Sequence, residues 1–154
     1  MRKIERIVIH CSGGPSTQSA ARIIDYHTRP VAQGGRGWKN PGYHYIIEQN
    51  GRIVTALPEN RIANGARGYN ATSIHICYCG GVDGKGKPKD TRTTEQTASL
   101  LRLVSELRER YGKIPVTGHR DLSPDRNHDG RITPDEWIKA CPCFEVSSLF
   151  TSAP

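Results

Sequence analysis

The sequence has no long hydrophobic run and a low content of apolar residues. Apolar side chains make up 35% of the 154 residues, and the longest apolar stretches, as in RIVIH and YIIE, are only a few residues long. A membrane-spanning helix needs about 20 consecutive apolar residues, so membrane insertion is excluded. The 16 glycines and 10 prolines indicate a chain rich in loops rather than a disordered one.

The chain also lacks a secretory signal. Its first residues, MRKIERIVIHC, are basic, but Glu5 and Arg6 interrupt them and no apolar segment follows. We therefore expect synthesis in the cytoplasm. The five cysteines are an odd number and cytosolic thiols stay reduced, so metal ligands or buried thiols are expected rather than a disulfide scaffold.

No internal repeat, low-complexity tract or linker divides the chain. A length of 154 residues fits one domain, and we predict a single domain over residues 1–154. The net charge of +7 attracts polyanions, namely nucleic acid, an anionic membrane surface or a bacterial cell wall. The basic residues are spread along the chain and only KGKPK, at 85–89, is a dense cluster, so no specific nucleic-acid site is expected.

Strands and helices alternate in the pattern of apolar residues, which favours the α/β class. Period-two runs rich in β-branched residues predict strands, and apolar residues at helical spacing predict helices. The Asn50-Gly51 pair predicts a hairpin with a tight primed turn, because both residues tolerate positive φ. The predicted strands cover residues 4–10, 43–57 as the hairpin, 73–79 and 113–119, and the predicted helices cover 17–30 and 94–111.

His10 and His119 each stand where a predicted strand ends, and reactive groups collect at such ends in open α/β sheets. A catalytic zinc takes three protein ligands and keeps one position for water. The spacing does not decide the third ligand. His75, Cys77 and Cys79 share one strand face, but residues four apart on a strand are separated by about 13 Å, so they cannot converge on one ion. Buried cysteines explain this triplet better.

Six segments of the chain carry a resemblance to a known family, namely IVIHCS, GYHYII, GARGYN, CYCGG, GHRDLSPD and KACPCF. Together they resemble the zinc N-acetylmuramoyl-L-alanine amidases, the family of phage lysozyme-type amidases and peptidoglycan-recognition proteins. The resemblance extends from about residue 4 to residue 146 and implies a central mixed β-sheet flanked by helices. It also implies that His10, His119 and Cys141 bind zinc, with Tyr43 and Lys139 as catalytic partners. Nothing physical in Cys-Pro-Cys prefers Cys141 to its neighbour as the ligand.

The sequence departs from the family in two places. The stretch NGARGYN has no histidine where many relatives carry one, and His75 stands where they often have a small residue. Neither departure touches the ligand set, and both concern substrate contacts. We interpret His27 and His44 as structural and His128 as solvated.

The resemblance implies hydrolysis of the amide between the lactyl group of muramic acid and L-alanine in peptidoglycan. Lys139 would place its own positive charge near the developing oxyanion, and Tyr43 would position water or take part in proton transfer. Without the resemblance, Lys139 reads as a solvated surface residue and Tyr43 as a core residue. Two other functions stay open, a non-catalytic peptidoglycan-binding protein of the same fold and a basic interaction protein, for example a polymerase regulator. We expect a monomer that reaches the wall through a holin, a secretion machine or lysis.

Residues 125–136, DRNHDGRITPDE, match a twelve-residue EF-hand calcium loop inserted in this domain. A bound Ca²⁺ would help to place Lys139, because the loop lies between His119 and that lysine. The alternative is a helix start without an ion, since Thr133 and Glu136 form a capping box. Pro124 also blocks the incoming helix of an EF-hand pair. The candidate calcium ligands are Asp125, Asn127, Asp129, Arg131 through its carbonyl, and Glu136, with Gly130 at the bend.

Overall fold

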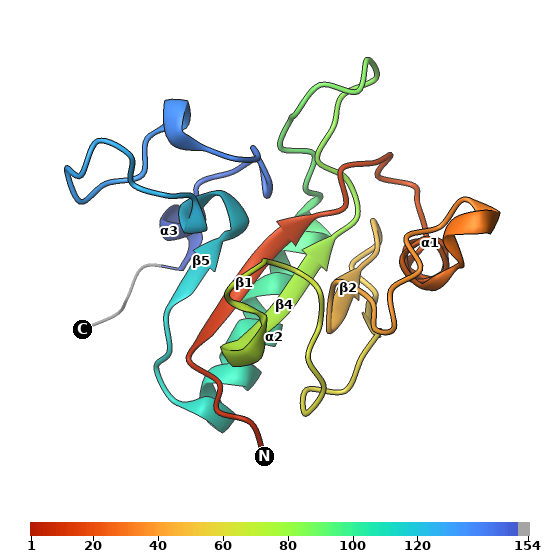
Figure 1. Ribbon diagram of the computed structural model, residues 1–154, viewed down its shortest axis with the longest axis horizontal. Helices are drawn as coiled ribbons and strands as arrows, with labels where there is room; N and C mark the ends of the chain where they lie inside the picture. Colours follow the sequence, from red (N-terminus) through yellow and green to blue (C-terminus); the bar gives the residue numbers. More distant parts are fainter. Residues whose placement is uncertain (151–154) are drawn as a thin grey trace.

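The computed structural model describes residues 1–150 and contains one five-stranded sheet in the order β3-β2-β4-β1-β5 (Figure 1). The β2 and β3 strands are antiparallel, and the other neighbours are parallel. The predicted α/β class with a central mixed sheet and flanking helices is therefore confirmed. The single domain predicted over 1–154 stays a prediction, and residues 151–154 lie outside the described residues. The strands are β1 (Arg6–Cys11), β2 (Tyr45–Ile47), β3 (Ile53–Thr55), β4 (Ser73–Tyr78) and β5 (Val116–Gly118).

Two helices cover the two faces of the sheet. The long helix α2 (Thr94–Tyr111) lies behind β1 and β4 in Figure 1, and α1 (Ala20–Thr28) lies on the other side near β2. Thr93 caps α2 with a capping box to Gln96, and Gly112 ends the helix with φ 83°. A short helix, α3 (Val146–Leu149), and four 3₁₀ turns complete the fold. These turns are η1 (Val31–Gln33), η2 (Asn70–Thr72), η3 (His119–Leu122) and η4 (Pro134–Glu136).

Side-chain alternation along β1 and β4 separates the core from the functional face. Ile7 and Ile9 of β1 belong to the larger apolar cluster, together with Leu100 and Leu107 of α2. Residues at the intervening positions point to the opposite face, where α1 packs over a smaller cluster. That smaller cluster contains Ala20, Ile23, Ile46, Cys77 and Cys79. His10 and His75 occupy the same alternate positions as Cys77, so the sheet presents them on the α1 side.

The hairpin between β2 and β3 differs from the predicted tight turn. Gly51 has φ 88°, whereas Asn50 is not among the residues with positive φ. Glu48 N–H donates to the Arg52 carbonyl, and Gly51 N–H donates to the Glu48 carbonyl. The Asn50 side chain accepts from Arg52 N–H, which stabilises a longer turn with a single left-handed residue. The primed two-residue turn was therefore wrong, while the hairpin itself is present.

No helix within residues 1–150 combines the length and the apolar character that crossing a membrane requires.

Candidate metal centre and active-site cleft

Three side chains from distant parts of the sequence meet at one end of the sheet. One donor atom each from His10, His119 and Cys141 lies within 4.8 Å of the other two. The Cys141 Sγ atom is 3.8 Å from His10 Nδ1, and the two imidazole centroids are 4.8 Å apart. Within residues 1–150 this is the one group of histidine, cysteine or acidic side chains gathered closely enough to hold a metal ion.

The sheet places the two histidines. The β1 and β5 strands are parallel neighbours in which Ile9 pairs with Gly118, so His10 and His119 each follow at the same end. His119 begins the turn η3 directly after β5. Strand pairing therefore fixes both imidazoles on a rigid element, as the sequence predicted from their position at strand ends.

Backbone hydrogen bonds bring the third donor to the histidines. Arg120 N–H donates to the Cys141 carbonyl at 2.8 Å, and Cys11 N–H donates to Cys141 Sγ at 3.2 Å. Gly118 has no side chain in the space that Pro142 fills, because a Cβ there would lie 2.8 Å from Pro142 Cδ. The Cys11 amide also stabilises negative charge on the sulfur, which suits a thiolate ligand.

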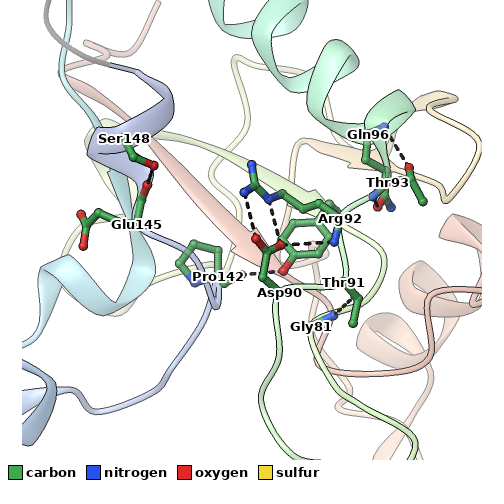
Figure 2. A network of polar contacts seen from close by, with 10 residues as sticks. Gly81, Asp90, Thr91, Arg92, Thr93, Gln96, Pro142, Glu145 and Ser148 are labelled. Carbon is green, nitrogen blue, oxygen red and sulfur yellow. Dashed lines mark hydrogen bonds and ion pairs between the residues drawn. The ribbon is translucent and has the colours of Figure 1, made fainter.

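The segment around Cys141 is further held by the loop that follows β4 (Figure 2). Tyr78 donates its hydroxyl to the Pro142 carbonyl at 2.6 Å. Arg92 makes two 2.9 Å bonds to the Asp90 carboxylate, and its guanidinium lies 3.5 Å from the centroid of the Phe144 ring. These contacts fix the chain on the C-terminal side of the ligand.

Electrostatics keep both imidazoles neutral. Burial lowers the pKa of His10 well below its usual range, and the neighbouring His75, His119 and Lys139 lower it further. Burial and the Lys139 charge lower the pKa of His119 to about 4. Neutral imidazoles have the free electron pair that a metal needs. Tetrahedral zinc places nitrogen and sulfur ligands about 3.5 Å apart, so the donor types and the spacing fit zinc.

Both predicted catalytic side chains lie at this site. The Tyr43 ring is 5.1 Å from the His10 ring between centroids, and the side chain is half-buried. Burial, followed by the thiols of Cys77 and Cys141, raises the pKa of Tyr43 well above its usual value, so the phenol is a hydrogen-bond donor. Lys139 is exposed and lines the same cleft.

The cleft in front of the donors has a volume of about 690 Å³ and is basic. Three cationic side chains line it, and none of its lining residues is acidic. The Arg36 guanidinium lies 4.9 Å from the centroid of the Trp38 ring. Sequence reasoning missed Arg36 and Trp38, because they stand in the glycine-rich loop after α1 without a periodic pattern. The cationic and aromatic lining residues are Tyr26, Arg36, Trp38, Tyr43, Arg67, Tyr69 and Lys139.

The histidines interpreted as structural are indeed buried. His27 accepts from Gly42 N–H at 3.0 Å, and its ring also lines the cleft beside Trp38. His44 accepts from His75 N–H at 3.0 Å. His128 is exposed.

His75 was assigned only to a buried strand face, but it contacts the candidate metal centre directly. Its Nδ1 atom is 2.8 Å from His10 Nε2. The register explains this contact, since His75 pairs with Val8, two residues before His10 on the adjacent parallel strand. The departure from the family pattern at this position was the one available signal.

In the loop 125–136, the carboxylates of Asp125, Asp129 and Glu136 do not form a close group of metal donors. The Asp125 carboxylate accepts from the amides of Asp129 and Gly130. The Glu136 carboxylate is buried and accepts from the amides of Arg126, Asn127 and Thr133. These contacts support the capping-box interpretation, in which the acidic side chains satisfy backbone donors. Calcium binding at this loop has no support from the structure.

Direct contacts join the two ends of this loop. Ile138 N–H donates to Ser123 Oγ at 3.0 Å, and the Arg120 guanidinium lies 4.0 Å from the centroid of the Trp137 ring. These contacts position the segment that leads to Lys139, which is the role that the sequence analysis gave to calcium.

Comparison with known proteins agrees with this geometry. An uncharacterised protein of Haemophilus influenzae is 43% identical over 103 residues, covering 67% of this chain and 89% of that protein. The endolysin of Enterobacteria phage T3 is 31% identical over 144 residues, covering 92% of this chain and 82% of the endolysin.

Among solved structures, the Ph2119 endolysin from a Thermus scotoductus bacteriophage superposes with a TM-score of 0.71 at 26% identity. The match covers 99% of this chain and 86% of that one. Residues 1–135 match the family described as N-acetylmuramoyl-L-alanine amidase. The predicted resemblance is confirmed, and the chain belongs to the N-acetylmuramoyl-L-alanine amidase family.

Proposed function

We propose that this protein is a zinc-dependent peptidoglycan hydrolase that cleaves the amide between N-acetylmuramic acid and the L-alanine of the stem peptide. Family membership supports cell-wall hydrolysis in general. The observation that carries the finer proposal is the meeting of His10, His119 and Cys141 within 4.8 Å in a cleft that Tyr43 and Lys139 also line.

Each ligand residue has a defined task. His10 and His119 offer neutral nitrogens, and Cys141 offers a sulfur that already accepts a backbone N–H. When bound, zinc supplies a water of pKa ~7 and polarises the scissile carbonyl. The substrate would reach the donors through the cleft that they line.

Lys139 and Tyr43 act on the charge that develops in the reaction. The exposed Lys139 ammonium lies close enough to lower the pKa of both histidines, so a carbonyl bound at these donors would also lie near its positive charge. We assign it the stabilisation of the oxyanion. The protonated Tyr43 hydroxyl is assigned a hydrogen bond to the attacking oxygen or the carbonyl oxygen.

The alternative is a peptidoglycan-binding protein of the same fold without catalysis. A protein that only binds has no need for three metal donors together with a lysine and a tyrosine at one cleft. The presence of all five side chains at one cleft therefore favours the enzyme. A monomeric state and delivery to the wall by a holin, a secretion machine or lysis stay predictions.

Digestion of purified peptidoglycan separates these functions. The zinc-loaded protein is expected to release new alanine amino termini without new reducing sugars. New reducing sugars would indicate a glycosidase and overturn the proposal. Binding to the polymer without release of either group would assign the protein to recognition.

A further inference from the structure

The two ring nitrogens of His10 face different partners. Nδ1 lies 3.8 Å from Cys141 Sγ, on the side of the donor group. Nε2 lies 2.8 Å from His75 Nδ1, in the buried interior. A neutral imidazole carries one proton, so Nδ1 has a free electron pair only when that proton is on Nε2. In that state His75 Nδ1 must accept the hydrogen bond.

Two neighbours enclose His75. Its backbone N–H donates to His44 Nδ1, and the two rings are stacked with an interplanar angle of 3°. On another side the ring packs against Gly65, where a Cβ atom would lie 2.3 Å from His75 Nδ1. The ring therefore fills the space that a side chain at residue 65 would need.

The hydrogen-bond inventory of His75 indicates a role other than stabilising the core. If Nδ1 accepts from His10, its proton is on Nε2, which is buried and has no partner among the residues that the structure describes. A buried donor without a partner destabilises a fold and calls for an explanation. Orientation of a neighbouring functional group is such an explanation.

Gly65 and His75 depend on each other through packing. A side chain at residue 65 and the ring of His75 would occupy the same space. The histidine on the central strand β4 is compatible only with the smallest residue on the loop before it.

We propose that His75 is a positioning residue for the metal centre, whose Nδ1 accepts a hydrogen bond from His10 Nε2–H and so keeps His10 Nδ1 free for the ion. This inference rests on the zinc site of the proposed function. It assigns the residue no contact with substrate. Hydrogen-bond partners of this kind typically change metal affinity by about 10- to 100-fold when removed.

A matched pair of variants tests the hydrogen bond separately from packing. The side chains of His75→Asn and His75→Leu have nearly the same shape, but only the asparagine has an oxygen where His75 Nδ1 lies. Zinc affinity of the chelator-stripped proteins is measured by competition with a chromophoric chelator. We expect the leucine variant to bind zinc about 10- to 100-fold more weakly and the asparagine variant to stay within about threefold of the native protein. Equal affinities of the two variants would overturn the inference.

Nitrogen-15 NMR of the native zinc-loaded protein gives a test that needs no variant. We expect the His10 proton on Nε2, protected from exchange, and the metal on Nδ1. Metal on Nε2 would overturn the inference even if the leucine variant failed to fold. A native protein that binds no zinc at all would instead refute the zinc site of the proposed function, so the two failures are distinguishable.

Discussion

The His10, His119 and Cys141 group and the loop 125–136 use their donor atoms in opposite ways. In the first, the donor atoms face one another across distances set by the sheet. In the loop, Asp125 and Glu136 turn their carboxylates onto nearby backbone amides. A rigid sheet can keep donor atoms away from backbone amides with which they would otherwise form hydrogen bonds. In a short loop, the carboxylates accept hydrogen bonds from the amides of the same loop. Close spacing in the sequence is therefore weaker evidence for a metal than convergence from distant elements.

The largest expected effect that tests this comparison is at Cys141. Cys141→Ser removes the sulfur donor, so bound zinc should fall from about one per chain to near zero and release of alanine amino termini should stop. Metal analysis and peptidoglycan digestion measure the two results.

Cys143→Ser is the matched control, because Cys143 is half-buried beside Cys11, with 3.9 Å between the sulfurs, and belongs to no donor group. It should retain zinc and activity. Loss of zinc from this control, with zinc retained in Cys141→Ser, would show that the wrong cysteine has been assigned.

A smaller effect is expected at Lys139, which is assigned the stabilisation of the oxyanion and does not bind the metal. Lys139→Ala should lower turnover about 100- to 1000-fold while zinc content stays unchanged, because an oxyanion stabiliser is lost. Steady-state kinetics on soluble peptidoglycan fragments measure the change. The exposed Lys113 offers a control for loss of one positive charge. Similar turnover in Lys113→Ala and Lys139→Ala would refute the assigned role.

The buried histidines His27 and His44 should make stability depend on pH. Burial lowers the pKa of His27 and of His44 from 6.5 to about 4. Between these pH values the unfolded chain binds more protons than the folded one. The free energy of unfolding therefore falls as the pH drops from about 6.5 to about 4 and levels off below.

Thermal unfolding of the chelator-stripped protein measures this dependence. His27→Gln should reduce the slope, because it removes one of these two groups whose pKa is lowered. A melting temperature that stays constant or rises as the pH falls through this window would contradict the account.

The smallest effect is expected from calcium. The EF-hand pattern predicts binding, but the Glu136 carboxylate, which would close the coordination shell, is buried and accepts from three backbone amides. We therefore expect calorimetry to detect no calcium binding and the melting temperature to stay unchanged. Binding with a dissociation constant below about 1 mM would show that the loop reorganises around the ion.

Much of the fold could be predicted from the sequence because its signals are periodic. The apolar spacing of α2, with Thr93 and Gly112 at its ends, indicated the longest helix. The Asn50-Gly51 pair indicated the hairpin but not its turn type, which depends on the bond between Glu48 and Arg52. Local patterns therefore predict elements better than the geometry between them.

The candidate site was predictable in a different way. Strand ends indicated His10 and His119, whereas Cys141 came from the family resemblance alone. The contact of His75 with His10 depends on the register of β1 and β4, which no single-strand pattern specifies. The sequence could not decide between a calcium loop and a capping box at residues 125–136, because backbone amides compete with an ion for the same carboxylates.

X-ray absorption at the zinc edge of the loaded native protein tests the central claim most directly. The account predicts one sulfur at about 2.3 Å together with two imidazole nitrogens at about 2.0–2.1 Å and one further light atom. A zinc shell without sulfur, or with two sulfurs, would contradict it.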